Sequence, residues 1–157
     1  MSYQITTPLA GFQPIAVTDT TQNHALGTIV TAEDETYGQG EFIYLTGVAS
    51  TAVGDVVIID QGTTVRAVAG SRGPVAVAMS ANVANQYGWY QISGRAVVKT
   101  AGSVADNALV YATATAGSVD DAVVSGDKVD GAVFRAAGTG ATTVVAVLDR
   151  PALNGNG

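Results

Sequence analysis

The sequence predicts an all-β fold, either a small β-barrel or a jelly-roll-like sandwich, with an extended N-terminal arm. Three observations predict it. Bulky and small residues alternate with a period of two in several short segments, as in strands that bury one face. Glycine is abundant, with 19 of 157 residues, and separates these segments as it does in tight turns. The Ala-rich segments lack the apolar stripe of an amphipathic helix.

The segment at residues 74–100 is the expected centre of the fold. Its side chains alternate in size on both sides of a turn-type stretch at residues 82–86. A second turn signal, Ser93-Gly94, follows, so the segment is interpreted as one hairpin or two linked hairpins. It contains the only tryptophan, Trp89. Because large aromatic side chains supply the most apolar area per residue, we expect Trp89 to be buried.

Composition shifts divide the chain into three parts. Residues 1–40 are interrupted by Pro8, Gly11 and Pro14, yet they are too apolar for a fully solvated tail. We expect this part to be an extended arm that orders against a neighbour, the alternative being a disordered tail. Residues 41–150 should form the β domain, and residues 151–157 a flexible tail that frays.

The strand signals of the central domain follow one another closely. The run Val56–Ile59 is continuously apolar, which is typical of a strand buried on both faces. Residues 53–59 also resemble residues 104–111, since in both an Asp precedes an apolar run; this marks two equivalent strand starts, or chance in a sequence of low diversity. The expected strands cover residues 42–47, 56–59, 63–69, 75–80, 87–92, 95–100, 109–112, 122–124, 132–136 and 142–148.

Charge and cysteine content exclude several kinds of partner and site. The net charge of −6 argues against nucleic-acid binding, which needs a basic face, and offers no polybasic segment for an anionic membrane. The chain has no cysteine, so disulfides and thiolate metal sites are excluded. Neither a signal peptide nor a long apolar segment that could span a membrane is expected.

The residues that could carry chemistry are few. His24, the only histidine, has no strained nucleophile turn beside it, so we expect an exposed polar side chain. Asp120, Asp121, Asp127 and Asp130 lie close in sequence and could bind calcium. They lack the spacing of a calcium loop, with its central glycine and closing glutamate, which favours a solvated acidic loop.

Two further segments contain residues that occur in nucleotide-binding sites. Lys99-Thr100 lacks the preceding glycines of a phosphate-binding loop, and Gly138-Thr139-Gly140 is typical of a turn. A small all-β nucleotide hydrolase would need a tyrosine, a glycine and a carboxylate on one strand, and residues 87–95 contain no carboxylate. We therefore expect a protein that is not an enzyme, with no catalytic, cofactor-binding or metal-binding residues and no cofactor.

Three short segments resemble the head decoration, or cement, proteins of tailed bacteriophages. They are residues 53–59 (VGDVVII), 73–78 (GPVAVA) and 90–96 (YQISGRA). The resemblance implies a protein made in the host cytoplasm that binds the outer surface of the capsid in the virion. It also implies the major capsid protein as partner, self-association as a homotrimer, and stabilisation of contacts between capsid subunits. No nucleic-acid or membrane partner is expected.

A carbohydrate- or surface-binding β module of a phage fibre or adhesin is the alternative. Trp89, Tyr87 and Tyr90 would then stack on sugar rings. Alternation along a strand places Tyr87 and Trp89 on one face and Tyr90 on the other, which argues against one platform formed by all three.

Overall fold

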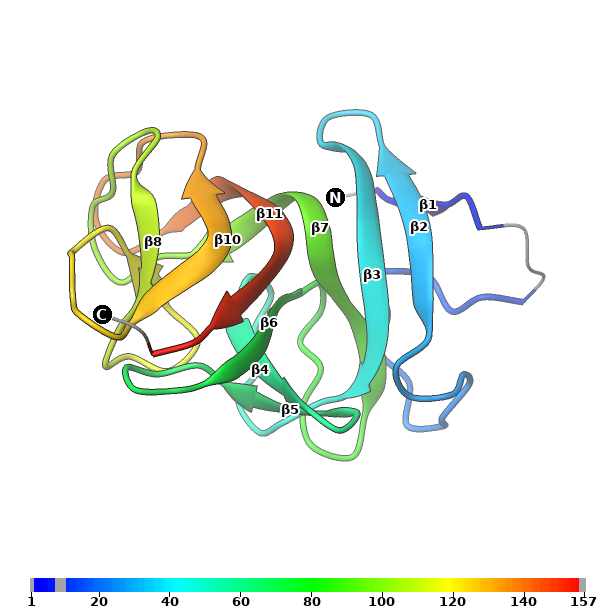
Figure 1. Cartoon of the computed structure of the whole chain (residues 1–157). Coiled ribbons are helices and arrows are strands. Elements are labelled where there is room, and N and C mark those ends of the chain that lie inside the picture. Colours follow the sequence, from blue (N-terminus) through cyan, green and yellow to red (C-terminus); the bar gives the residue numbers. More distant parts are fainter. Residues whose placement is uncertain (1, 8–10, 156–157) are drawn as a thin grey trace.

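The computed structural model describes residues 2–7 and 11–155, and every regular element among them is a β-strand (Figure 1). The strands pair antiparallel in a single sheet that does not close, in the order β1-β2-β3-β7-β6-β11-β10-β8-β9, with β4 paired to β6 and β5 to β4. The all-β prediction is confirmed, and the open sheet is consistent with a sandwich or jelly-roll-like fold. The strands are β1 (Gln4–Ile5), β2 (Ile29–Asp34), β3 (Gly38–Thr46), β4 (Val56–Asp60), β5 (Thr63–Arg66), β6 (Gly73–Ala78), β7 (Tyr87–Lys99), β8 (Leu109–Ala112), β9 (Val119–Asp120), β10 (Lys128–Phe134) and β11 (Thr143–Leu153).

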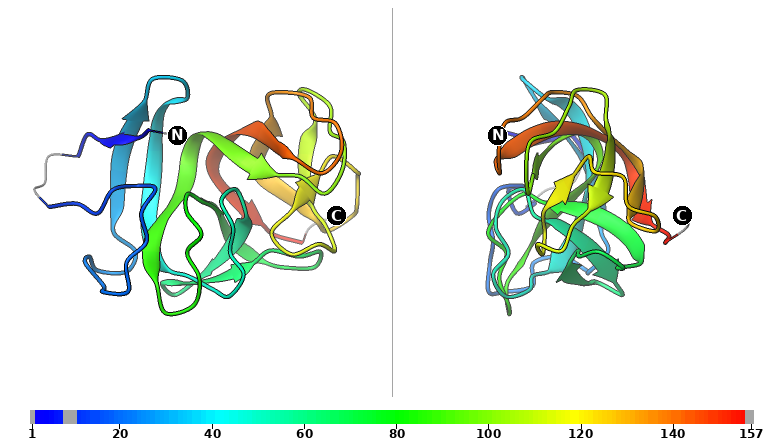
Figure 2. Two further views of the ribbon diagram at one scale, coloured as in Figure 1. Left: turned by 180° about the vertical axis from the view of Figure 1, so that it is seen from behind. Right: turned by 90° about the vertical axis from the view of Figure 1, so that its left-hand side faces the viewer.

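Strand β7 joins the two halves of the molecule. Its first half pairs with β3 and its second half with β11, and Ser93 is the residue at which both pairings meet. In Figures 1 and 2, β7 accordingly runs from the β1–β3 side of the molecule to the β8–β11 side. The turn expected at Ser93-Gly94 is wrong, because the strand continues through these residues without reversing. Gly94 adopts a φ of 95°, and a Cβ there would lie 2.4 Å from the Gln39 carbonyl oxygen, so the crossing requires glycine.

Buried side chains form three clusters around β7. The large cluster lies among β4, β6, β8, β10, β11 and the second half of β7, and includes Phe134 and Leu148. The tryptophan cluster is made of Ile15, Val30, Ala32, Phe42, Tyr44, Met79 and Trp89. The third is made of Leu45, Val57, Ala76, Ala78, Tyr90 and Ile92. Trp89 is fully buried, as predicted, and Tyr90 belongs to a different cluster, as alternation requires.

The structure differs from the expected arm and tail. Strand β2 pairs with β3 along its whole length, and its side chains Val30 and Ala32 are buried. Ile15 is only 2% exposed, and the Gln13 carbonyl accepts a hydrogen bond of 2.8 Å from the Trp89 indole N–H. Much of residues 11–40 therefore belongs to the folded body, because their apolar side chains complete the tryptophan cluster.

The expected domain boundaries also fall inside strands. Residue 40 lies within β3 and residue 150 within β11. Leu153 is buried in the large cluster, so the first residues of the expected tail are held by packing and do not fray. Met1, residues 8–10 and residues 156–157 lie outside the described part of the chain, and with them Pro8 and the end of the expected tail.

Most expected strands occur, with two differences around β9. The run Val56–Ile59 forms β4, whose side chains Val56 and Val57 enter different clusters, as predicted for a strand buried on both faces. The expected strand at residues 122–124 is wrong, since Val123 is 82% exposed in a loop. Its neighbours β9 and the start of β10 were not predicted, because apolar composition alone does not distinguish a buried strand from an exposed loop.

A repeated turn directly precedes six of the strands, namely β2, β4, β7, β8, β9 and β10. In each, the third residue has a positive φ and the fourth donates its N–H to the carbonyl of the first, as in a type II turn. The positive-φ residues are Gly27, Gly54, Asn85, Asn107, Gly117 and Gly126. The similarity between residues 53–59 and 104–111 therefore reflects equivalent strand starts. Asp55 follows its positive-φ residue, whereas Asp106 precedes Asn107, so the true counterpart of Asp55 is Asp127.

The buried position of Ile15 predicts a large effect of mutation in a segment expected to be an arm. Ile15→Ala should lower the free energy of unfolding by about 2–5 kcal/mol, because it leaves a cavity beside Trp89. Val17, two residues away, is 46% exposed, and Val17→Ala should change stability by less than about 0.5 kcal/mol. Chemical denaturation followed by Trp89 fluorescence measures both. Equal stability of the two variants would show that residues 11–17 do not pack on the domain.

Candidate docking surfaces

His24 lies in a half-buried position against aromatic rings. Its ring centroid is 5.0 Å from that of Tyr44, 5.1 Å from that of Phe12 and 5.5 Å from that of Trp89. Its Nε2 accepts a hydrogen bond of 3.1 Å from the Gln13 N–H. The expectation of an exposed polar side chain is wrong, because the imidazole helps to hold residues 11–24 over the tryptophan cluster.

The four aspartates weighed as a calcium site each have a separate partner. Asp120 accepts from the N–H of Ala122, Asp121 from that of Ala105, and Asp127 from that of Gly70. Asp130 forms an ion pair of 3.1 Å with Lys128. Within the described residues, no three His, Asp or Glu side chains come together as metal ligands would. These carboxylates shape loops.

The two segments weighed as nucleotide sites also have structural roles. Lys99 lies 3.3 Å from the carboxylate of Asp55, and the Thr100 hydroxyl donates to the carbonyl of Thr142. Gly138 exchanges backbone hydrogen bonds with Val104 in an isolated bridge. Neither segment presents unpaired N–H groups as a cradle for phosphate.

All ten aromatic side chains are at least half-buried. Trp89 and Tyr90 are fully buried, and Tyr87 is half-buried beside Tyr44, with ring centroids 6.4 Å apart. The Tyr3 hydroxyl donates to the Arg95 carbonyl, and burial raises the pKa of Tyr3 to about 12. A sugar-stacking platform needs an open ring face. None of the ten is in the exposed class, which gives such a platform little support.

Asp55 is a fully buried carboxylate that ties four segments together. Its Oδ2 accepts from Arg66 Nε at 2.8 Å and from the Ala52 N–H at 3.0 Å, and its Oδ1 lies 3.3 Å from Lys99 Nζ. Gly117 covers it so closely that a Cβ there would lie 2.6 Å from the Asp55 carboxyl carbon. A buried charge must be paired and hydrogen-bonded. Asp55 is, which indicates a structural role.

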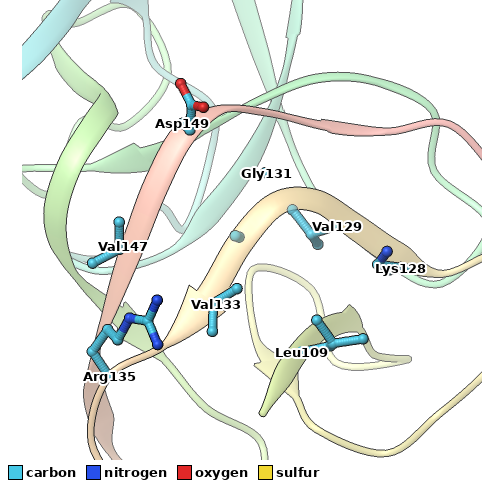
Figure 3. Close-up of a pocket in the computed structure, with 9 residues that line it drawn as sticks. Leu109, Lys128, Val129, Gly131, Val133, Arg135, Val147 and Asp149 are labelled. Carbon is cyan, nitrogen blue, oxygen red and sulfur yellow. The ribbon is translucent and has the colours of Figure 1, made fainter. Parts of the chain in front are cut away.

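The outer face of β8, β10 and β11 carries an apolar row. Leu109 pairs with Val133 and Val133 with Val147, so the three outward side chains lie side by side. They line a shallow hollow of about 310 Å³. Figure 3 shows these three side chains, with Arg135 and Asp149 at opposite ends of the hollow and Lys128 further along β10. We call Leu109, Val133 and Val147 the valine face.

Three cations and one carboxylate, Asp149, lie around the valine face, although the whole chain is acidic. Arg95 lies opposite Val147 on β7, and Arg135 and Lys128 flank the row on β10. Arg135 donates to the side-chain oxygen of Asn107. Among the described residues, neither Arg95 nor Arg135 has a carboxylate within ion-pair distance, whereas Lys128 pairs with Asp130. The face therefore favours an apolar partner that carries negative charge.

A second apolar surface lies where β3 and β11 diverge from β7. Ile29, Ile43, Ile59 and Ile92 line it together with Pro74, Val75 and Pro151, and we call it the isoleucine groove. Arg150 at its rim donates to Glu41 at 3.0 Å and 3.3 Å. This arginine has a φ of 40°, in a bulge opposite Gly131 that turns its side chain towards β3. The cation at the rim is thus already paired within the chain.

Comparisons with family models, curated proteins and solved structures found no match. Within residues 2–7 and 11–155, no helix has the length and apolar character needed to cross a membrane.

The environment of Asp55 predicts that its carboxylate is needed for stability. Asp55→Ala should lower the free energy of unfolding by about 3 kcal/mol, the lower end for a broken buried pair, because Arg66 and Lys99 are partly solvated. Asp106→Ala removes an exposed carboxylate from the segment that resembles this one in sequence and should change stability by less than about 0.5 kcal/mol. Thermal melting by circular dichroism compares the two. A small loss for Asp55→Ala would contradict the structural role.

Proposed function

We propose that this protein is a capsid decoration protein, which binds the outer surface of a phage head and stabilises contacts between subunits of the major capsid protein. It acts as a homotrimer, is made in the host cytoplasm and functions in the virion. Its role is structural, without catalysis or a cofactor. Neither nucleic acid nor a membrane is a partner.

The segments that resemble decoration proteins support the proposal by their arrangement. Residues 53–59 form a turn and β4, residues 73–78 form β6, and residues 90–96 form the middle of β7. Strand β4 pairs with β6, and β6 pairs with β7. The three short similarities therefore make up one contiguous unit of the sheet, which is expected if they reflect a common core.

The observation that carries the proposal is the contrast between interior and surface. The chemistry-bearing side chains that the sequence offers, such as His24, Asp55 and Asp127, are used inside the chain. Two of the exposed surfaces are aliphatic: the valine face and the isoleucine groove. Contiguous exposed apolar surfaces mark interaction sites, and two of them suit a protein that contacts both its own copies and a shell.

The carbohydrate-binding alternative has less support. It depends on open aromatic rings, and Tyr87, Trp89 and Tyr90 are half-buried or buried. No other observation favours it.

Binding to empty heads tests the proposed function. We expect the full chain to cosediment with empty, expanded heads of the phage that encodes it. When the heads enclose a fluorescent dye, decorated heads should release it only at a higher temperature than bare heads do. Many weak contacts repeated over a shell add up, which is the physical reason for this stabilisation.

A matched pair of variants locates the contact. Ile29 in the isoleucine groove is 41% exposed and Val17, outside it, is 46% exposed. Ile29→Asp should weaken head binding at least tenfold, whereas Val17→Asp should bind as the unmodified chain does. If the unmodified chain binds no heads but binds sugars on a glycan array, the decoration proposal is wrong.

A further inference from the structure

We propose that the loop at residues 120–125 of one copy docks on the valine face of a second copy. In this contact, copies associate through two different surfaces, the loop and the valine face. It rests on the proposed function only for the number of copies, three.

The loop is an apolar projection with a fixed shape. Val123 is 82% exposed and Val124 is 47% exposed, so neither is covered within its own chain. At the base of the loop, the carboxylates of Asp120 and Asp121 hold backbone N–H groups at 3.1 Å and 2.8 Å. Because these bonds already order the loop, little conformational entropy is lost when it docks.

The valine face has the matching chemistry. Its row of aliphatic side chains lines a shallow hollow of about 310 Å³, and Figure 3 shows these side chains. Arg95 and Arg135 beside it lack carboxylate partners among the described residues. Asp120 and Asp121 directly precede the segment that carries Val123 and Val124. Docking would therefore place the valines of the loop against the aliphatic side chains of the valine face. It would place the loop carboxylates near the guanidinium groups of Arg95 and Arg135.

Charge favours the valine face over the isoleucine groove as the site for this loop. At the groove, the guanidinium of Arg150 is already paired with Glu41, and Asp60 lies beside Ile59. Asp120 and Asp121 are adjacent in sequence, so the loop carries two carboxylates close together. At the valine face, Arg95 and Arg135 have no carboxylate partner among the described residues and can compensate these charges.

The contact uses a different surface on each copy. A copy that gives its loop to one neighbour keeps its face free for another, and repetition of such a heterologous contact closes a ring when the rotation allows it. In the proposed trimer, each copy would contribute one loop and one face.

Three variants of the full chain test the contact by light scattering coupled to size exclusion. Val123→Asp alters the loop, Leu109→Asp alters the face at a side chain that is 43% exposed, and Val65→Asp alters a 53% exposed valine on β5, away from both. We expect the unmodified chain and Val65→Asp to assemble, and the other two to elute as monomers. Circular dichroism should show all four folded.

Mixing the two defective variants makes the test specific. Val123→Asp retains an intact face and Leu109→Asp an intact loop, so together they should form a one-to-one complex although each alone is monomeric. The inference is overturned if the unmodified chain stays monomeric at every concentration, if Val123→Asp assembles normally, or if the mixture forms no complex.

Head binding by the unmodified chain, measured separately, distinguishes the two proposals. A monomer that still binds heads overturns this inference alone. An oligomer with the expected variant behaviour that binds no heads supports this contact and overturns the decoration role.

Discussion

The fold depends on one strand that serves three clusters of buried side chains. Along β7, Trp89 enters the tryptophan cluster, Tyr90 and Ile92 the third cluster, and Ala96 and Val98 the large cluster. This is possible because the strand changes partners at Ser93 and bends at Gly94, against the backbone of β3. A side chain at Gly94 would separate β3 from β7, and the two halves would lose their shared strand.

Buried polar groups supply the rigidity that a core of small residues lacks. Valine and alanine bury little area per side chain, so the chain relies on hydrogen-bonded turns to fix where each strand begins. In two of these turns an aspartate follows the positive-φ glycine, and both carboxylates are buried with backbone N–H partners, Asp55 at Ala52 and Asp127 at Gly70. Asp55 adds Arg66 and Lys99, which connects β5 and β7 to the start of β4.

The sequence predicted features that depend on neighbouring residues. It did not predict features that depend on contacts with residues far away along the chain. Alternation predicted the strands, the burial of Trp89 and the separation of Trp89 from Tyr90. It could not predict that Ile15 and β2 complete the tryptophan cluster, because that depends on a partner more than fifty residues away. Ser93-Gly94 has the composition of a reversing turn, yet two neighbouring strands hold it extended. Residues 122–124 look like a strand and form a loop, because no strand lies beside them to accept their hydrogen bonds.

The overall charge of the chain and the local charges on its surface have opposite effects on the association of two copies. With a net charge of −6, two copies repel at long range, so association needs an orientation in which attraction exceeds this repulsion. Arg95 and Arg135 have no ion-pair partner among the described residues and lie beside an aliphatic row, so they can provide it. Salt screens both the general repulsion and the local attraction, but the apolar part of the contact is unaffected by screening. In the proposed contact between copies, charge would therefore select the orientation, and aliphatic burial would supply most of the strength.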